Sequence, residues 1–269
     1  MRIVRFIDKD HSVRSGVRHQ DGSVTLLEGS VYSRPADSGV VASPVTFLSP
    51  VEPSAILCIG LNFRDHAKEI GCAEPVTPVL FMKNPSALNH PGAPIVIPRS
   101  CEAVPEVDYE IELAVVIGKT AKDVKEDDAL GHVLGYTIAN DVSARRWQKS
   151  NSGQWVRAKS FDTFCPLGPE LLTRDEIPDP QSLELVCRLN GEVMQRGSIG
   201  EMFFSVARII ALLSQDMTLL PGTVILTGTP SGVGVGRKPQ VFLKPGDRLD
   251  LTIEPIGTLT NTVVSAPAL

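Results

Sequence analysis

Three acidic side chains stand where this sequence could hold a metal ion. Glu110 and Glu112 lie in the run 107–118, which alternates acidic and apolar residues and then becomes a continuous apolar stretch. This pattern predicts a strand, in which residues two apart point to the same side. Asp141 would add a third carboxylate, because a second predicted strand, 133–139, ends in Asn140-Asp141. With no His or Cys among them, these ligands suit a hard cation, Mg²⁺ or Mn²⁺. The alternative is an edge strand whose acids face water.

The two glutamates also need a positive partner, because like charges on one strand face repel each other. No lysine or arginine lies nearby in the sequence. Lys83, at the end of the predicted strand 79–83, could face such a site or solvent. Arg157 and Lys159 would share one face of a predicted extended run, 154–164. There Lys159 could hold a carboxylate or an enolate, although a surface position fits the local pattern equally well.

A possible proton relay lies in the short helix predicted for residues 61–71, which would end at Gly71 as its C′ residue. His66 and Glu69 are three residues apart and therefore neighbours on one helix face. A carboxylate beside an imidazole orients the ring and raises its basicity. The local sequence alone would also allow an incidental ion pair on an exposed turn.

A glycine-rich loop, 229–236, follows the predicted buried strand 221–228. Such loops let backbone N–H groups approach an anion. The loop lacks the Gly-Lys-Ser/Thr ending of a P-loop and the glycine spacing of a dinucleotide site. It is therefore expected to bind a carboxylate or oxyanion, or to be a plain tight turn.

The elements that would position these residues are mostly strands and turns. Residues 1–52 are predicted to form a small N-terminal β domain, and residues 53–269 the catalytic domain. Hairpins are expected at Asp21-Gly22 and at the Asn-Gly turn within 183–193, and an amphipathic helix at 205–213. The predicted fold class is mixed, β-rich α+β.

Composition narrows the function classes. The chain has 269 residues, and its net charge of −5 gives no electrostatic case for nucleic acid or an anionic membrane. Its apolar stretches fall well short of the roughly twenty residues of a membrane span. Five cysteines without a C-x-x-C spacing suggest reduced thiols and a cytoplasmic protein. A mitochondrial protein is the alternative if a leader has been removed.

Taken together, five motifs in order resemble the fumarylacetoacetate hydrolase family over the chain from about residue 55 onward. They are residues 60–66 (GLNFRDH), 108–113 (DYEIEL), 140–145 (NDVSAR), 158–162 (AKSFD) and 227–234 (TGTPSGVG). The resemblance implies a β-sandwich roll that forms a homodimer. It also implies roles for site residues: Glu110, Glu112 and Asp141 as ligands of Mg²⁺ or Mn²⁺; Lys159 at the substrate's 2-oxo oxygen; Arg145, Gln148 and Thr229 as substrate-binding residues; His66 and Glu69 as an acid–base pair on a lid.

The activity implied by the resemblance is metal-dependent chemistry on small 2-oxo acids through a metal-stabilised enolate. The favoured reaction is enol–keto tautomerisation of oxaloacetate, after the family member that the motifs resemble most. C–C bond hydrolysis of acylpyruvates and decarboxylation of oxaloacetate are the alternatives within the family. A metal-dependent ligand-binding protein without turnover is the alternative of another class.

Overall fold

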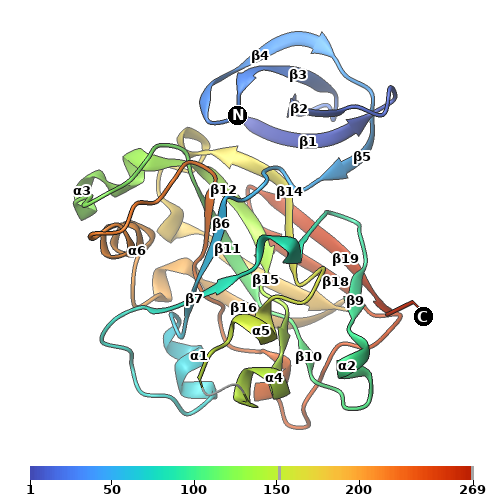
Figure 1. The fold of residues 1–269 in the computed structure, drawn as a ribbon, viewed down its shortest axis with the longest axis vertical. Helices are drawn as coiled ribbons and strands as arrows, with labels where there is room; N and C mark the ends of the chain where they lie inside the picture. Colours follow the sequence, from blue (N-terminus) through green and yellow to red (C-terminus); the bar gives the residue numbers. More distant parts are fainter. Residues whose placement is uncertain (151–152, 268–269) are drawn as a thin grey trace.

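The computed structural model describes residues 1–150 and 153–267, and strands make up most of its regular structure (Figure 1). One large sheet organises the fold. Its strands run in the order β4 (Ser33–Val41), β3 (Val24–Ser30), β2 (Val13–Arg18), β1 (Arg2–Asp8), β14 (Cys165–Thr173), β12 (Val133–Asn140), β11 (Ile111–Ile117), β17 (Thr223–Leu226), β6 (Ala55–Gly60) and β7 (Val79–Lys83), with β5 (Pro44–Leu48) paired to β1 and β8 (Leu88–Asn89) to β14.

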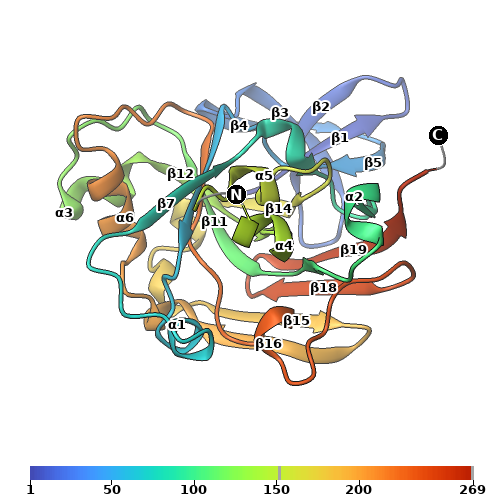
Figure 2. The ribbon, with the colours of Figure 1, turned by 60° about the horizontal axis from the view of Figure 1, so that its bottom comes forward.

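A second sheet packs beside the central strands of the first. It runs β16 (Glu192–Ser198), β15 (Glu184–Leu189), β18 (Arg248–Ile253), β19 (Gly257–Ser265) and β9 (Ile95–Ile97). Figure 2 shows its strands alongside β11 and β14, and contacts join β14 to β19 and β11 to β15. The predicted Asn-Gly hairpin is confirmed: Asn190 and Gly191 take positive φ angles of 53° and 88° between β15 and β16.

Helices are short and lie around the sheets. They are α1 (Arg64–Glu69), α2 (Arg99–Glu102), α3 (Glu126–Ala129), α4 (Arg145–Ser150), α5 (Val156–Lys159) and α6 (Val206–Leu213), with 3₁₀ turns η1 (Pro85–Ala87), η2 (Leu130–His132), η3 (Arg174–Glu176), η4 (Pro180–Ser182), η5 (Ile199–Glu201) and η6 (Gly234–Gly236). The predicted amphipathic helix is α6, whose N-cap Ser205 accepts a hydrogen bond from the Arg208 N–H. No helix among the described residues has the length and apolarity to cross a bilayer.

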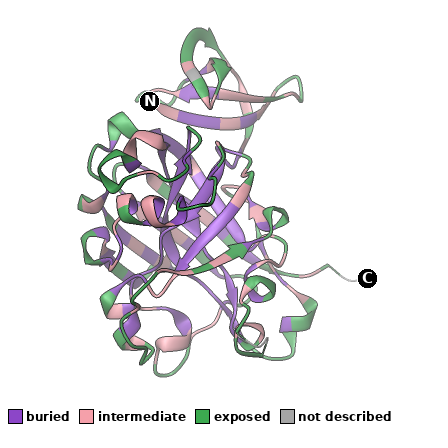
Figure 3. Ribbon diagram, turned by 60° about the vertical axis from the view of Figure 1, so that its left-hand side comes forward, coloured by how far each residue is buried: buried purple, intermediate pink, exposed green. Residues whose placement is uncertain are grey.

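The core lies on the central strands, which appear as the buried purple band of Figure 3. Every residue of β11 is buried, because sheet neighbours flank it on both edges and other elements cover both faces. The arrangement confirms the predicted β-rich α+β class. Carboxylates placed at the end of such a strand are held by a rigid scaffold.

The N-terminal strands β1–β5 form the upper lobe of Figure 1. They join the rest through β1, which pairs with β14 at Arg2↔Leu172 and Ile3↔Leu171. Val4, Phe6 and Val24 form a small apolar cluster of their own. The division of the chain into domains at residue 52 stays a prediction.

Two predicted elements are wrong in detail. The strand 107–118 is interrupted between β10 (Val107–Asp108), which pairs with β13 (Ser143–Ala144), and β11. The extended run 154–164 contains the helix α5, so Arg157 and Lys159 do not share a face: two helical positions differ by about 200° in direction. Lys159 points inward and is buried, whereas Arg157 is exposed and packs over Trp147 and Phe161.

Candidate functional site

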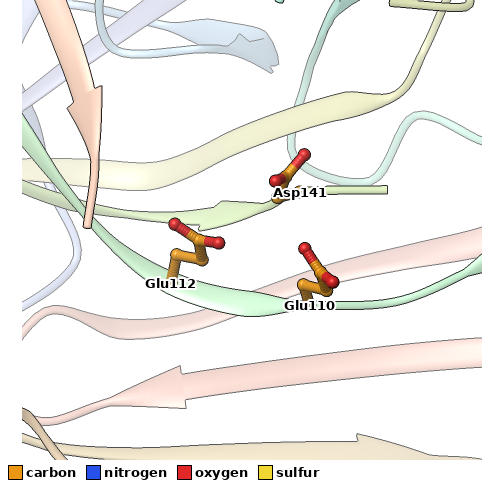
Figure 4. Close-up of side chains that lie close together, drawn as sticks. All are labelled: Glu110, Glu112 and Asp141. Atoms are coloured by element: carbon orange, nitrogen blue, oxygen red, sulfur yellow. The ribbon is translucent and has the colours of Figure 1, made fainter. Parts of the chain in front are cut away.

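Three acidic side chains converge at the point where β11 begins and β12 ends. Glu110 occupies the break before β11, Glu112 lies on β11, and Asp141 directly follows β12. Each offers an oxygen, and these oxygens lie within 4.8 Å of one another. Figure 4 shows the two glutamates rising to the same side of one strand, with Asp141 facing them from its neighbour. The three residues are 5%, 2% and 0% exposed, which excludes the alternative of an edge strand with its acids in water.

The break in the strand coincides with hydrogen bonds from its backbone to side chains. Three consecutive backbone N–H groups donate to side chains instead of to a neighbouring strand: Tyr109 to Asp108 (2.9 Å), Glu110 to Asn140 (3.1 Å) and Ile111 to Gln195 (3.0 Å). These bonds satisfy the buried donors without a regular ladder. They hold Glu110 at the edge of the site.

Lys159 is the positive partner that the carboxylates need. Its Nζ lies 2.6 Å from Glu110 Oε2 and 2.6 Å from Asp141 Oδ2, so the ammonium bridges two of the three acids. Local sequence patterns could not predict this pairing, because Lys159 follows Glu110 by 49 residues.

Lys83, whose direction the sequence left open, is fully buried and lies behind Asp141. Its Nζ is 2.7 Å from Asp141 Oδ1. The same ammonium donates to the carbonyl oxygens of Val142 (3.0 Å), Lys159 (2.6 Å) and Phe164 (2.8 Å). Lys83 therefore links the Asp141 side chain to the backbone of the helix that presents Lys159.

Arg145 closes the other side of the acidic group. Its Nε donates to Asp108 (2.8 Å), one terminal nitrogen donates to Glu110 (2.7 Å) and the other to Gln148 Oε1 (3.0 Å). Sequence reasoning gave Asp108 no role. The alternating pattern of the sequence could have indicated this role, since Asp108 precedes Glu110 by two residues and can reach the same side.

Charge and burial act differently on the two glutamates. Burial alone would raise the pKa of Glu110, but Lys159 and Arg145 outweigh it and hold that pKa below its ordinary value. The pKa of Glu112 is raised well above its ordinary value, first by burial and then by the charges of Asp141 and Glu110. The ionised form of Glu112 is therefore disfavoured by burial and by its neighbouring carboxylates, and a bound cation would offset this cost.

The predicted acid–base pair is formed on α1. His66 Nδ1 lies 3.1 Å from Glu69 Oε2, and both side chains are largely buried, so the exposed-turn alternative is excluded. Glu69 Oε1 accepts from the Gly232 N–H (2.9 Å), and Asp65 accepts from the N–H (3.1 Å) and hydroxyl (2.5 Å) of Ser231. These bonds fix α1 against the glycine-rich loop.

The glycine-rich loop binds carboxylates that belong to this chain. Gly232 donates to Glu69, while Gly234 (2.7 Å) and Val235 (3.0 Å) donate to Asp108. Gly236 is required for close approach, because a Cβ there would lie 2.6 Å from Glu69 Cδ. These N–H groups are thus occupied by carboxylates of the chain itself, and Thr229, Val235 and Gly236 are the residues of the loop that line the cavity.

One cavity of about 700 Å³ brings all nine candidate residues together. Its polar lining includes Glu110, Glu112, Asp141, Lys159, His66, Glu69, Arg145, Gln148 and Thr229, and also Lys149, Arg237, Lys238 and Gln240, to which the sequence prediction gave no role. Phe81 and Trp155, with ring centroids 5.2 Å apart, add an apolar wall. The volume is in the range typical of sites for small molecules.

The acidic group fits a small divalent cation by its donor chemistry. All three ligands are carboxylate oxygens, which Mg²⁺ and Mn²⁺ prefer. Oxygens on opposite sides of Mg²⁺ stand about 4.2 Å apart, because each Mg–O distance is about 2.1 Å. Three oxygens within 4.8 Å of one another therefore need little movement to share one ion, which leaves further positions for water or substrate.

Comparison with known proteins places the chain among relatives over most of its length. The profile described as "Fumarylacetoacetate (FAA) hydrolase C-terminal" matches residues 55–264. The human protein named "Oxaloacetate tautomerase FAHD2A, mitochondrial" is 50% identical over 224 residues, which cover 82% of this chain and 70% of the relative. A Dictyostelium discoideum protein named "Fumarylacetoacetate hydrolase domain-containing protein 2 homolog" is 46% identical over 225 residues, which cover 80% of this chain and 73% of that relative.

Solved structures share the whole fold. One is a 5-carboxymethyl-2-hydroxymuconate delta-isomerase from Mycobacterium smegmatis, with a TM-score of 0.86 and 38% identity over 99% of this chain and 100% of the other. Another is a fumarylacetoacetate hydrolase from Exiguobacterium antarcticum, with a TM-score of 0.87 and 39% identity over the same shares. The likeness extends through the N-terminal strands.

Proposed function

The chain belongs to the fumarylacetoacetate hydrolase family, and from that premise we propose that it catalyses the enol–keto tautomerisation of oxaloacetate with a bound Mg²⁺ or Mn²⁺. One observation carries the reaction class: three buried carboxylates, a buried lysine and a His–Glu pair open into one cavity. The choice of oxaloacetate rests on the name of the human relative, which is 50% identical.

Glu110, Glu112 and Asp141 would hold the ion. When bound, it supplies Lewis-acid stabilisation of negative charge on a substrate oxygen. Only Glu110 and Asp141 share the Lys159 ammonium, whereas Glu112 depends on a neighbouring N–H group, that of Gly228 at 2.6 Å. Glu112 is therefore the ligand that gains most when positive charge arrives.

Lys159, Arg145, Gln148 and Thr229 would hold the 2-oxo acid. The Lys159 ammonium stabilises charge that develops on the 2-oxo oxygen as the enol loses its proton. Arg145 donates to Gln148 Oε1, so the amide NH₂ of Gln148 is the end that remains able to donate to a ligand. Thr229 would donate its hydroxyl to the carboxylate.

His66 would carry the proton that tautomerisation moves to or from C3. Because Glu69 engages Nδ1, Nε2 is the ring nitrogen left for proton transfer. Glu69 in turn is fixed by the Gly232 N–H. The pair can thus deliver or accept a proton at one place without changing the position of the ring.

C–C bond hydrolysis of acylpyruvates is the second candidate, because the same Nε2 could activate a water molecule, and the Exiguobacterium antarcticum neighbour is named as a hydrolase. Decarboxylation of oxaloacetate needs the cation and Lys159 to stabilise the enolate left when CO₂ departs, and that enolate then takes a proton at C3, which solvent can supply, to give pyruvate.

We also propose that the chain forms a homodimer. A mitochondrial location, which the human relative's name gives for that protein, competes with the cytoplasmic one expected from composition.

A substrate panel with Mg²⁺ tests the proposal. Enol-oxaloacetate is followed by the loss of its ultraviolet absorbance, and acetylpyruvate and fumarylpyruvate are assayed under the same conditions. Enzymatic loss of the enol without pyruvate formation supports tautomerisation. Cleavage of the acylpyruvates with slow tautomerisation would favour the hydrolase, pyruvate from oxaloacetate the decarboxylase, and an inactive panel a ligand-binding protein.

A further inference from the structure

Gln195 is a buried polar residue outside the cavity that contacts two parts of the site. It lies on β16 in the second sheet and is 1% exposed. Its Nε2 donates to Thr229 Oγ1 (2.7 Å) and to the Pro230 carbonyl (2.9 Å), and its Oε1 accepts from the Ile111 N–H (3.0 Å). Thr229 lines the cavity, and Ile111 lies between the two glutamates of the acidic group.

The orientation of the Gln195 amide follows from its backbone partners. The Ile111 N–H can only donate, so it needs the amide oxygen; the Pro230 carbonyl can only accept, so it needs the amide nitrogen. Turning the amide over would break both bonds and leave buried groups unpaired. One hydrogen of the NH₂ group goes to Pro230, and the other must go to Thr229.

This direction determines what the Thr229 hydroxyl can do. A hydroxyl oxygen that accepts from Gln195 still has one hydrogen to donate. Among residues 1–150 and 153–267, no hydrogen bond uses that hydrogen. Since Thr229 lines the cavity, the hydrogen is available to a ligand, and the matching ligand atom is an acceptor such as a carboxylate oxygen.

We propose that Gln195 is a positioning residue that makes the Thr229 hydroxyl a hydrogen-bond donor to the carboxylate of a bound 2-oxo acid. This inference rests on the proposed function and extends it to a residue that touches no substrate. The bond from Ile111 has a second effect: one amide fixes both the carboxylate-binding hydroxyl and the start of the strand that presents Glu112.

The test is Gln195→Glu, which keeps the shape of the side chain. The introduced carboxyl group has at most one hydrogen where the amide has two, so it cannot donate to both Pro230 and Thr229. Thr229 then turns its own hydrogen toward the new oxygen and away from the cavity. Oxalate, the smallest dianion that resembles the carboxyl and oxo groups of the substrate, is the probe, titrated calorimetrically with Mg²⁺ present.

We expect the Kd for oxalate and the KM for oxaloacetate to rise about tenfold or more, as for loss of a hydrogen bond to a charged group, with kcat within about threefold. Thr229→Val should produce a similar rise, and Thr229→Ser should keep the affinity of the wild type. In the Thr229→Val background, adding Gln195→Glu should change the Kd less than about twofold, because the two residues act through one hydrogen bond.

Equal effects of Gln195→Glu with and without the Thr229 hydroxyl would overturn the proposal, as would an unchanged Kd. Thermal unfolding and Mg²⁺ binding show whether the variant is folded, and Gln195→Leu supplies the same cycle if it is not. Oxalate binding separates this inference from the proposed function: a wild type without tautomerase activity that still binds oxalate through Thr229 would contradict only the latter.

Discussion

Lys83 Nζ lies 2.7 Å from Asp141 Oδ1, and both side chains are fully buried. The other carboxylate oxygen of Asp141, Oδ2, lies 2.6 Å from the Lys159 ammonium. Each carboxylate oxygen of Asp141 thus contacts a lysine, one on strand β7 and one on helix α5. Its direction toward the cavity is a property of the folded scaffold and does not depend on a ligand.

Lys83→Met should destabilise the protein by about 3–5 kcal/mol, the usual result of leaving one member of a buried ion pair alone. It should also weaken Mg²⁺ binding, because Asp141 loses the contact that orients it. Chemical denaturation and metal titration measure the two effects. The control is Arg14→Met, since Arg14 pairs with Asp10 at 2.6 Å and the two side chains are 38% and 55% exposed. That control should cost less than about 1 kcal/mol. Equal losses in the two variants would argue against a special role for Lys83.

Glu112→Gln should stabilise the metal-free protein at alkaline pH. Burial and two neighbouring carboxylates raise the pKa of Glu112 above its ordinary 4.5. The folded protein therefore holds that proton more tightly than the unfolded chain, and stability falls as the pH rises from about 4.5 through the raised pKa. The amide does not ionise and can still accept from the Gly228 N–H.

Thermal unfolding in EDTA measures this effect. The variant's advantage in Tm should grow from pH 4 to pH 8, with each kcal/mol worth about 2–4 °C in a protein of this size. Mg²⁺ should raise the Tm of the wild type and leave the variant unchanged. A difference in Tm that does not depend on pH would contradict the raised pKa.

His66→Ala should lower kcat for tautomerisation by about 10²–10⁴, the usual contribution of a positioned acid or base. Mg²⁺ affinity should stay within about twofold, because His66 is not among the three acidic ligands. Decarboxylation of oxaloacetate should be affected far less, because its C–C bond breaks without a proton from the imidazole and solvent can protonate the resulting enolate at C3. The control is His132→Ala, whose ring Nδ1 lies 3.0 Å from the Thr120 carbonyl oxygen and outside the cavity lining. Similar losses in both reactions would exclude His66 as the proton carrier.

Gly236→Ala tests the contact between the loop and α1. The added Cβ would lie 2.6 Å from Glu69 Cδ, so the Glu69 side chain must move and lose its bonds to His66 or to the Gly232 N–H. We expect a loss of at least about tenfold in kcat/KM with a small change in Tm, because the side chain can move without unfolding the strands. Gly131→Ala is the control, since a Cβ at Gly131 meets nothing within 4 Å. Wild-type activity in Gly236→Ala would show that the pair need not be held.

Much of the acidic site could be predicted because strand geometry is local. Glu110 and Glu112 lie on one side through the two-residue period, and the Asn190-Gly191 turn follows from the positive φ angles that these residues tolerate. The contacts that distant residues make with the site could not be predicted from strand geometry. Lys83, Lys159 and Gln195 reach the site through the order of the strands, which local patterns do not specify.

The predictions of a continuous strand at 107–118 and of an extended run at 154–164 were wrong for a similar physical reason. The interruption at Tyr109 and Glu110 arises because side chains of Asn140 and Gln195 take up backbone N–H groups, and no pattern within the strand signals such bonds. In the helix α5, Lys159 turns inward while Arg157 stays exposed, which an extended run would not allow. In both places tertiary contacts outweigh the local preference.

Stoichiometric titration with Mn²⁺, followed by electron paramagnetic resonance of the free ion, tests the central claim that the three carboxylates share one divalent cation. We expect one ion per chain in the wild type and in the control Glu170→Gln, since Glu170 is a buried carboxylate that pairs with Arg2 outside the cavity lining. We expect loss of that ion in Asp141→Asn while the protein stays folded. Mn²⁺ bound by Asp141→Asn with wild-type affinity would contradict it.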